Sequence, residues 1–167
     1  MLPKIRIGEG HDIHRTIKGR PLVIGGVHIE CDFGLDGHSD ADVLLHAIVD
    51  ALLGATGQGD IGEWFPNTSE EFKDADSAKL LQEVWDSVKA GGWQLVNLDC
   101  TVSAEKPRLK GVKPLIRSQL AKFLGCDELR VNVKAKSGEA VGPIGRGEAI
   151  SADVVVLLCQ MSMKGAS

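Results

Sequence analysis

The segment HSDADVLLHAIVDALLG, residues 38–54, decides the fold that this chain is expected to adopt. Apolar residues recur at the three- and four-residue intervals of an amphipathic helix over residues 40–53, and Gly54 follows as a stop. Ser39 and Asp42, three residues apart, have the pattern of a helix N-terminal cap. The segment therefore predicts a helix with one buried face and one polar face.

Outward from this helix, the same patterns extend over the rest of the chain. Two more helices are predicted at residues 77–90 and 114–124, each followed by glycine. Apolar runs predict strands at residues 4–8, 22–29, 94–104, 129–136 and 150–160, with a glycine bend in the second. Because strands and helices alternate, the expected fold class is α/β: a two-layer sandwich of a mixed sheet with helices on one face. No repeat or linker interrupts residues 1–167, which indicates a single domain.

The composition excludes several classes of protein. The 167 residues carry a formal net charge of -4, with 43% apolar and 25% charged residues. Acidic and basic residues are interspersed, so the sequence lacks the basic patch that nucleic-acid binding requires. Its apolar runs are too short to span a bilayer, and residues 1–10 lack the apolar core of a signal peptide. We therefore expect a cytoplasmic protein with neither a nucleic-acid nor a membrane partner.

The four cysteines point away from disulfides and from thiolate metal sites. None of Cys31, Cys100, Cys126 and Cys159 belongs to a C-x-x-C pair. Without a signal peptide, buried free thiols are the simpler interpretation. Any metal site must then be built from His, Asp and Glu.

Asp12 and His14 form half of a candidate metal site. They lie at a strand end, two residues apart. On an extended chain this spacing makes their side chains point the same way, while Ile13 points the opposite way. His46 would complete three protein ligands to zinc, and a fourth, open position is typical of a catalytic zinc. The alternative is that these are surface polar groups that end a strand and cap a helix, because short motifs often match by chance.

Two carboxylates flank His46 on its helix. Asp42, His46 and Asp50 are spaced four residues apart and share the polar face. Metal-bound imidazoles usually have their second ring nitrogen held by a neighbouring group. We therefore expect one of these two carboxylates to hold His46.

Three further polar segments each allow a structural and a functional interpretation. Residues 59–68, rich in Gly, Pro and Asn, form either a connector between helices or a contact for substrate hydroxyls. Residues 104–110 hold three cations beside a proline, as in a solvated loop or a nucleotide site. Residues 134–139 and 145–148 combine hydroxyl, glycine, basic and carboxylate groups, which suits either a turn or a site for phosphate and metal.

Together these segments resemble the 2-C-methyl-D-erythritol 2,4-cyclodiphosphate synthase family over residues 5–160. Eight motifs carry the resemblance: G-x-G-x-D-I-H at 8–14, H-S-D-A-D-V-L-L-H at 38–46, D-A-L-L-G at 50–54, G-D-I-G-x-x-F-P at 59–66, F-K-D-A-D-S at 72–77, A-E-K-P-R-L at 104–109, V-N-V-K-A-K at 131–136 and G-R-G-E at 145–148. One such motif is weak evidence, whereas eight in the family's order and spacing are specific.

The resemblance implies an activity and an assembly. The substrate would be 4-diphosphocytidyl-2-C-methyl-D-erythritol 2-phosphate, and the products 2-C-methyl-D-erythritol 2,4-cyclodiphosphate and CMP, in non-mevalonate isoprenoid biosynthesis. The resemblance also implies a homotrimer with active sites between subunits. The attacking 2-phosphate belongs to the substrate and is already ionised at neutral pH, so positioning and charge screening are the tasks left to the protein.

The resemblance further assigns roles to matching positions. The zinc ligands would be Asp12, His14 and His46, and Glu139 would help to hold a second divalent ion, Mg²⁺ or Mn²⁺. His38 and Ser137 would position or stabilise the reacting phosphates. The implied substrate-binding residues are Ser39, Asp60, Ile61, Gly62, Phe65, Pro66, Asn67, Thr68, Ser69, Ala104, Glu105, Lys106, Pro107, Arg108, Leu109, Lys110, Lys136, Gly138, Pro143 and Arg146.

Some positions depart from the family pattern. The departures are His11 in place of a usual Phe, Pro143 in place of a frequent aromatic residue, Asn67 and Ser69 in place of Asp, and Ser137-Gly138 in place of Thr-Thr. Strand alternation predicts that His11 points away from Asp12 and is not a zinc ligand. His11 would then either contribute to an anion site on the threefold axis, where some relatives bind isoprenoid diphosphates, or hydrogen-bond Glu148.

Two other functions compete with the synthase. One is a zinc hydrolase that acts on a phosphoester, with Asp42 or Asp60 as its general base. The other is a non-catalytic trimer with a structural zinc and a cavity for a prenyl diphosphate. The cytidine-site pattern at residues 104–110 favours the synthase over both.

Overall fold

The computed structural model of the chain describes residues 4–66 and 76–160. Its strands are β1 (Lys4–Lys18), β2 (Leu22–Ile24), β3 (Val27–Ile29), β4 (Phe33–Leu35), β5 (Trp93–Ser103), β6 (Val131–Lys136) and β7 (Ala149–Gln160). Its α-helices are α1 (Val43–Thr56), α2 (Ile61–Trp64), α3 (Ser77–Ala90), α4 (Lys113–Leu124) and α5 (Gly142–Gly145), and its 3-10 turns are η2 (Leu109–Gly111) and η3 (Glu128–Arg130). None of the helices in these ranges is long and apolar enough to cross a membrane.

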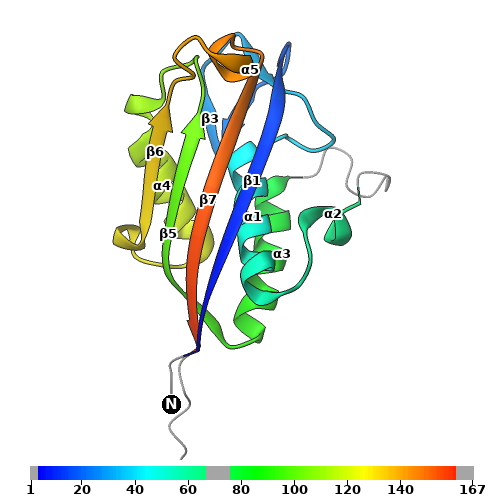
Figure 1. Ribbon diagram of the computed structural model, residues 1–167, viewed down its shortest axis with the longest axis vertical. Helices are drawn as coiled ribbons and strands as arrows, with labels where there is room; N and C mark the ends of the chain where they lie inside the picture. Colours follow the sequence, from blue (N-terminus) through cyan, green and yellow to red (C-terminus); the bar gives the residue numbers. More distant parts are fainter. Residues whose placement is uncertain (1–3, 67–75, 161–167) are drawn as a thin grey trace, which may run out of the picture.

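Five of the strands form one mixed sheet in the order β4-β1-β7-β5-β6 (Figure 1). β5 and β6 pair in parallel, whereas the other neighbours pair antiparallel. β2 and β3 form a separate antiparallel hairpin. The predicted α/β class and mixed sheet are confirmed.

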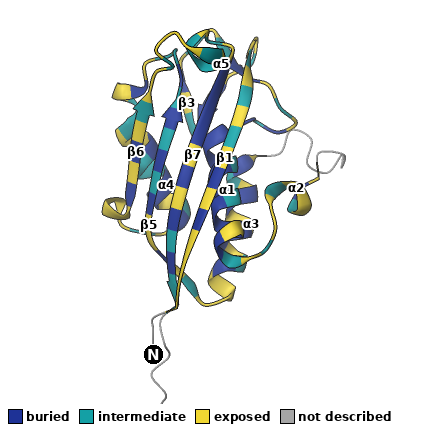
Figure 2. Ribbon diagram, viewed as in Figure 1, coloured by how far each residue is buried: buried dark blue, intermediate teal, exposed yellow. Residues whose placement is uncertain are grey.

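The long helices α1, α3 and α4 lie on one face of the sheet, and the core fills the space between the two layers. Leu44, Ile48 and Leu52 of α1 are fully buried there. The other face is open in the single chain (Figure 2), and its exposed apolar residues are Ile5, Ile7, Ile13, Ile17 and Val155. The four cysteines are free thiols, as expected.

The predicted end of the first strand at residue 8 is wrong. β1 runs on to Lys18 because residues 4–15 pair in continuous register with β7. The middle of β1 is polar, so hydrophobic alternation does not predict a strand there. Pairing with β7, and not hydrophobicity, holds these residues extended. Asp12 and His14 therefore lie inside a long strand, where both are paired with β7.

The predicted start of the long helix is also wrong. α1 begins at Val43, and its N-cap is Asp42 and not Ser39. The single strand predicted at residues 22–29 is instead the β2–β3 hairpin. Its turn residues Gly25 and Gly26 have φ of 62° and 74°, a region that favours glycine.

Gly8 and Gly10 of β1 allow α1 to lie directly against the strand. A Cβ on Gly8 would lie 1.9 Å from the carbonyl oxygen of Ala51, and one on Gly10 would lie 2.0 Å from that of Ala47. Both distances are far below van der Waals contact, so only glycine fits at these two positions. The close contact sets the spacing between β1 and α1 beside the candidate ligands.

Asp42 joins the start of α1 to the β2–β3 hairpin. Its side chain is fully buried and accepts hydrogen bonds from the N–H groups of Leu44 and Leu45, as an N-cap does. It also accepts from Gly25 N at 2.8 Å and Gly26 N at 2.7 Å. One carboxylate therefore fixes both a helix terminus and a turn.

We expect Asp42→Ala to lower the free energy of unfolding at pH 7 by about 1–3 kcal/mol. The variant loses an N-cap and leaves the hairpin N–H groups without this acceptor. Burial raises the pKa of Asp42 to about 6, so desolvation of the charge offsets part of that loss. Urea denaturation measures the change, with Asp76→Ala, the exposed N-cap of α3, as the matched control. A smaller loss for Asp42→Ala than for the control would contradict this account.

Candidate metal centre and active site

Three side chains from β1 and α1 converge on one point. Asp12 Oδ2 lies 2.9 Å from His14 Nε2 and 3.1 Å from His46 Nδ1, and the two histidine nitrogens are 3.2 Å apart. Within residues 4–66 and 76–160, they form a group with the donor types and proximity that a metal site needs. Donors held at 2.0–2.1 Å by a tetrahedral zinc would be about 3.3 Å apart, so the triangle fits that ion closely.

The protonation of His14 also suits a metal ligand. His14 Nδ1 lies 2.6 Å from the carbonyl oxygen of Asp36. A carbonyl only accepts hydrogen bonds, so Nδ1 carries the proton and Nε2 presents a lone pair toward Asp12 and His46. This is the tautomer in which His14 can ligate a metal through Nε2.

His46 is held from the other side of its ring. Its Nε2 lies 2.8 Å from Ser77 Oγ and 3.2 Å from Ser39 Oγ, which leaves Nδ1 directed at Asp12. The prediction that Asp42 or Asp50 would hold this nitrogen is wrong. Asp42 is committed to backbone N–H groups, and Asp50 accepts from Ile61 N at 2.7 Å.

The electrostatics keep Asp12 ionised. Burial alone would raise its pKa. In the metal-free chain, however, protons on the facing nitrogens of His14 and His46 donate to Asp12, and these hydrogen bonds hold its pKa well below its usual range. Burial would lower the pKa of His14, yet its hydrogen bond and charge interaction with Asp12 raise it overall. A metal that binds here would replace those protons and use the freed imidazole lone pairs, so metal and protons compete for the site as the pH falls.

Several predicted site residues surround these ligands. A pocket of about 200 Å³ is lined by Asp12, His14, His46, Gly37, His38, Ser39, Ile61, Gly62, Phe65 and Leu80. Asp60 lies beside it as the exposed N-cap of α2, where it accepts from Glu63 N at 3.0 Å. Pro66 is exposed at the end of the same segment. The predicted substrate contacts Asn67, Thr68 and Ser69 lie outside the described residues.

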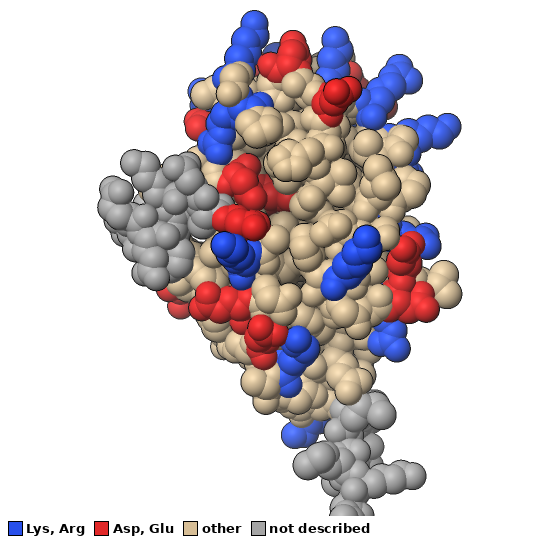
Figure 3. Space-filling view, turned by 180° about the vertical axis from the view of Figure 1, so that it is seen from behind, with Lys and Arg blue, Asp and Glu red and all other residues tan. Residues whose placement is uncertain are grey.

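A second pocket collects most of the residues predicted for the nucleotide. Its volume is about 550 Å³, and it is lined by Ala104, Glu105, Pro107, Arg108, Leu109, Lys110, Lys113, Ala135, Lys136 and Ser137. Four cations against one carboxylate make this lining attractive to phosphate. On the helical side of the molecule, Lys and Arg side chains gather at the end where β5 and β6 terminate (Figure 3).

Ser137 and Glu139 interact with each other at the edge of the second pocket. Ser137 Oγ donates to Glu139 Oε1 at 2.8 Å, and Gly138 N donates to Glu105 at 3.0 Å. The two pockets share no lining residue. One chain therefore does not bring Ser137 and Glu139 together with the Asp12 group in a single cavity.

The remaining candidates lie at the end of the sheet near α5. Pro143 is an exposed residue of α5, and Arg146 follows that helix. The Arg146 guanidinium makes two hydrogen bonds with the Glu148 carboxylate, at 2.8 and 3.0 Å. Lys106 precedes Pro107 through a cis peptide bond and is exposed.

His11 points away from the ligands, as strand alternation predicts. The suggested hydrogen bond to Glu148 is wrong, because Glu148 is paired with Arg146. His11 Nδ1 instead lies 2.7 Å from Asp153 Oδ1 on the open face of the sheet. The register of β1 on β7 places His11 opposite Asp153, a pairing that needs the long-range strand alignment to be known.

Two residues of the site were missed from the sequence. Lys113, in the second pocket, lies just before the helix predicted at residues 114–124 and was given no role. Ser77, at the start of α3, was assigned only to a helix start and to a family motif. Its contact with His46 joins residues 31 positions apart, so no local pattern signals it.

Comparison with known proteins points to one family. The family model described as YgbB family matches residues 5–159. A curated relative, the 2-C-methyl-D-erythritol 2,4-cyclodiphosphate synthase of Halalkalibacterium halodurans, is 54% identical over 154 residues, which cover 92% of this chain and 98% of the relative.

Two solved structures share the fold. The bifunctional IspDF from Campylobacter jejuni matches with a TM-score of 0.92 and 43% identity, over 96% of this chain and 43% of that one. The IspF of Plasmodium falciparum, in a complex with CDP, matches with a TM-score of 0.84 and 32% identity, over 97% of this chain and 100% of that one.

Proposed function

This chain belongs to the YgbB family, and on that premise we propose that it is a phosphorus–oxygen lyase of non-mevalonate isoprenoid biosynthesis. It converts 4-diphosphocytidyl-2-C-methyl-D-erythritol 2-phosphate to 2-C-methyl-D-erythritol 2,4-cyclodiphosphate and CMP. The observation that carries this proposal is the Asp12, His14 and His46 group, three ligands at one wall of a pocket in a chain 54% identical to a curated synthase.

The reaction is an intramolecular phosphoryl transfer. An oxygen of the 2-phosphate bonds to the β-phosphorus, the bond from that phosphorus to the bridging oxygen breaks, and the oxygen leaves on CMP. Asp12, His14 and His46 would hold zinc, which supplies Lewis-acid polarisation of phosphate oxygens. The chain's own residues fold the substrate into a ring and screen repulsion between its phosphates.

The residues of the two pockets divide this work. His38 and Ser137 donate hydrogen bonds to the reacting phosphates, while Arg108, Lys110, Lys113 and Lys136 attract the cytidylyl diphosphate. Asp60, Ile61 and Gly62 contact the methylerythritol hydroxyls. The support is their placement, since Ile61 and Gly62 line the metal pocket and the cations line the second pocket.

Glu139 would help to hold a second divalent ion, Mg²⁺ or Mn²⁺, which would screen the phosphate charges. Its carboxylate is exposed and lies next to Ser137 Oγ. Hard oxygen ligands of this kind suit Mg²⁺ and Mn²⁺, which keep open positions for phosphate oxygens.

The active protein would be a cytoplasmic homotrimer with its active sites between subunits. Two observations support the assembly: the open apolar face of the sheet, and the separation of the two pockets within one chain. A partner that brings its second pocket to the first chain's metal pocket would complete the site. Sedimentation equilibrium tests this, and a monomer at micromolar concentration would overturn it.

The decisive test of the reaction is its nucleotide product. The purified chain, supplied with Zn²⁺, Mg²⁺ and the cytidylated substrate, should release CMP and the cyclic diphosphate in equal amounts. A zinc hydrolase would release inorganic phosphate instead, and a non-catalytic zinc protein would leave the substrate intact. Either of those results would overturn the proposal.

Ser137→Ala should lower kcat by about 10²-fold while changing CMP affinity little. A hydroxyl aimed at the reacting phosphate acts mainly in the transition state, where loss of one such donor has an effect of this size. Steady-state kinetics and CMP titration measure the two quantities, with Ser87→Ala on α3 as the control. An unchanged kcat with matched losses in CMP affinity and kcat/KM would make Ser137 a binding contact only.

A further inference from the structure

Ser77 connects the candidate metal centre to a carboxylate outside it. Its side chain is fully buried, and its Oγ lies 2.8 Å from His46 Nε2. The same Oγ makes a short hydrogen bond with Asp40 Oδ1. The chain of contacts therefore runs from Asp40 through Ser77 to His46, and from there to the metal position.

For a neutral His46 that ligates a metal through Nδ1, the protons along this chain have one arrangement. An ionised carboxylate only accepts, so the Ser77 hydroxyl donates its single proton to Asp40. Ser77 Oγ can then only accept from His46, which places the imidazole proton on Nε2. Nδ1 is left with a lone pair, directed at Asp12 Oδ2 at 3.1 Å.

Ser39 alone does not fix this arrangement. Its Oγ lies 3.2 Å from His46 Nε2 and accepts from Ala41 N at 3.1 Å. The Ser39 hydroxyl proton is not committed to a carboxylate, so Ser39 can donate to Nε2 as readily as accept from it. If it donates, the proton of His46 sits on Nδ1, where it blocks metal binding.

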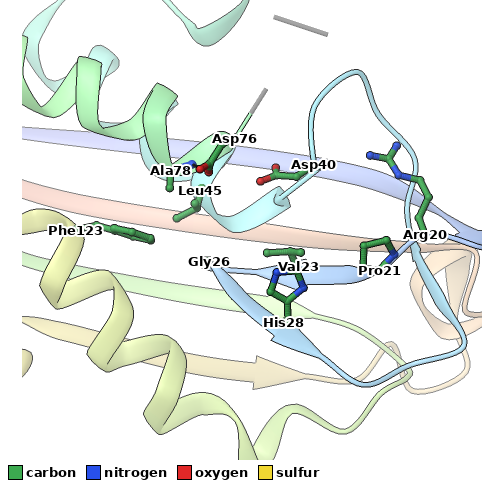
Figure 4. Close-up of a pocket in the computed structure, with 10 residues that line it drawn as sticks. All are labelled: Arg20, Pro21, Val23, Gly26, His28, Asp40, Leu45, Asp76, Ala78 and Phe123. Carbon is green, nitrogen blue, oxygen red and sulfur yellow. Dashed lines mark hydrogen bonds between the residues drawn. The ribbon is translucent and has the colours of Figure 1, made fainter. Parts of the chain in front are cut away.

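The Asp40 carboxylate is positioned to accept from the Ser77 hydroxyl, and no hydrogen bond joins it directly to Asp12, His14 or His46. It accepts from Ser77 N at 3.1 Å and from Asp42 N at 3.1 Å, so its carboxylate is fixed at the start of both long helices. Figure 4 shows Asp40 near Asp76 in a separate pocket of about 400 Å³. That pocket shares no lining residue with the metal pocket. Ser77 Oγ is the side chain through which Asp40 contacts His46.

We infer that Ser77, aligned by Asp40, is a positioning residue that sets the tautomer and ring orientation of His46 and thereby the metal affinity of the site. The inference rests on the proposed function, in which His46 is a zinc ligand. Loss of a partner to a ligating histidine typically costs 10–100-fold in metal affinity. Ser77 acts before any substrate arrives, so its effect is measurable without turnover.

The first test is zinc affinity in competition with a chromophoric chelator. Ser77→Ala should bind zinc about 10–100-fold more weakly than the unsubstituted chain. Ser87→Ala is the matched control, since it also removes a serine hydroxyl from α3. The Ser87 hydroxyl donates to Gln58 Oε1 and not to a candidate ligand. The zinc affinity of this control should be unchanged. Equal zinc affinity in the Ser77 and Ser87 variants would overturn the inference.

The second test asks whether Asp40 acts through Ser77. Asp40→Asn should weaken zinc binding by a similar factor. The amide can donate to Ser77 Oγ, and the Ser77 hydroxyl proton is then free to turn toward His46. The zinc affinity of the double variant, with Asp40→Asn and Ser77→Ala combined, should lie within about threefold of that of Ser77→Ala alone. Additive losses, or no loss in Asp40→Asn, would overturn the relay. If Ser77→Ala does not fold, the Asp40→Asn measurement alone decides the question.

These outcomes separate the inference from the function on which it rests. If the unsubstituted chain binds zinc and releases CMP but Ser77→Ala retains full affinity, the relay is wrong and the proposed function stands. If the unsubstituted chain binds no zinc, the metal assignment fails and the relay fails with it.

Discussion

His46→Ala should lose bound zinc and CMP release together. The variant removes one of the three proposed ligands, so a metal would be left with Asp12 and His14 alone. Lewis-acid stabilisation worth several kcal/mol then disappears, which corresponds to a fall of at least about 10³-fold in kcat/KM. Elemental analysis of dialysed protein and a CMP-release assay measure the two losses.

The control for this variant is His28→Ala, an exposed histidine of β3 outside the metal pocket. It should keep full zinc content and full activity. His46→Ala should remain folded, because the core face of α1 is built from apolar side chains that it leaves in place. Full zinc occupancy in His46→Ala would show that the metal lies elsewhere.

Gly10→Ala should destabilise the fold by about 3 kcal/mol or more. Its Cβ would meet the Ala47 carbonyl oxygen at 2.0 Å and the Ala51 nitrogen at 2.8 Å, and both are backbone atoms of α1 that no side-chain rotation can move aside. Overpacking of this severity lies at or above the upper end of the usual range. A domain of this size should lose roughly 10 °C in Tm.

Gly111→Ala is the control for Gly10→Ala, since a Cβ there has no neighbour within 4 Å and its backbone needs no positive φ. It should change Tm by less than about 2 °C. If Gly10→Ala remains folded, α1 must shift away from β1, and the zinc affinity should fall because His46 moves relative to Asp12. A Gly10→Ala variant with unchanged Tm would refute the close contact between strand and helix.

Local periodicity predicted those parts of the fold that local forces determine. The α3 helix is a clear case, since an amphipathic pattern over residues 77–90 and a closing Gly91 match its observed bounds. The spacing of Asp12 and His14 likewise indicated one shared direction, which β1 maintains. These features depend on neighbours in the sequence, which a single chain reveals.

Features that depend on distant segments were missed. The full length of β1 depends on pairing with β7, at the far end of the sequence. Helix spacing favoured Asp42 or Asp50 as the partner of His46, but Gly25 and Gly26 of the hairpin donate to the Asp42 carboxylate. The Ser77 hydroxyl reaches His46 across 31 residues, and serine at a helix start usually indicates no more than a terminus.

The place of β7 in the sheet has a consequence for the order of events during synthesis. β7 is the last strand of the described chain, yet it lies between β1 and β5 and separates them in the sheet. Until residues 149–160 have left the ribosome, β1 and β5 cannot join, and α1 lacks part of the surface on which it packs. Contacts between the first and last strands give the chain a high contact order, which slows folding. The sheet should therefore form only after residues 149–160 have emerged from the ribosome, with the helices synthesised earlier exposed to chaperones until then.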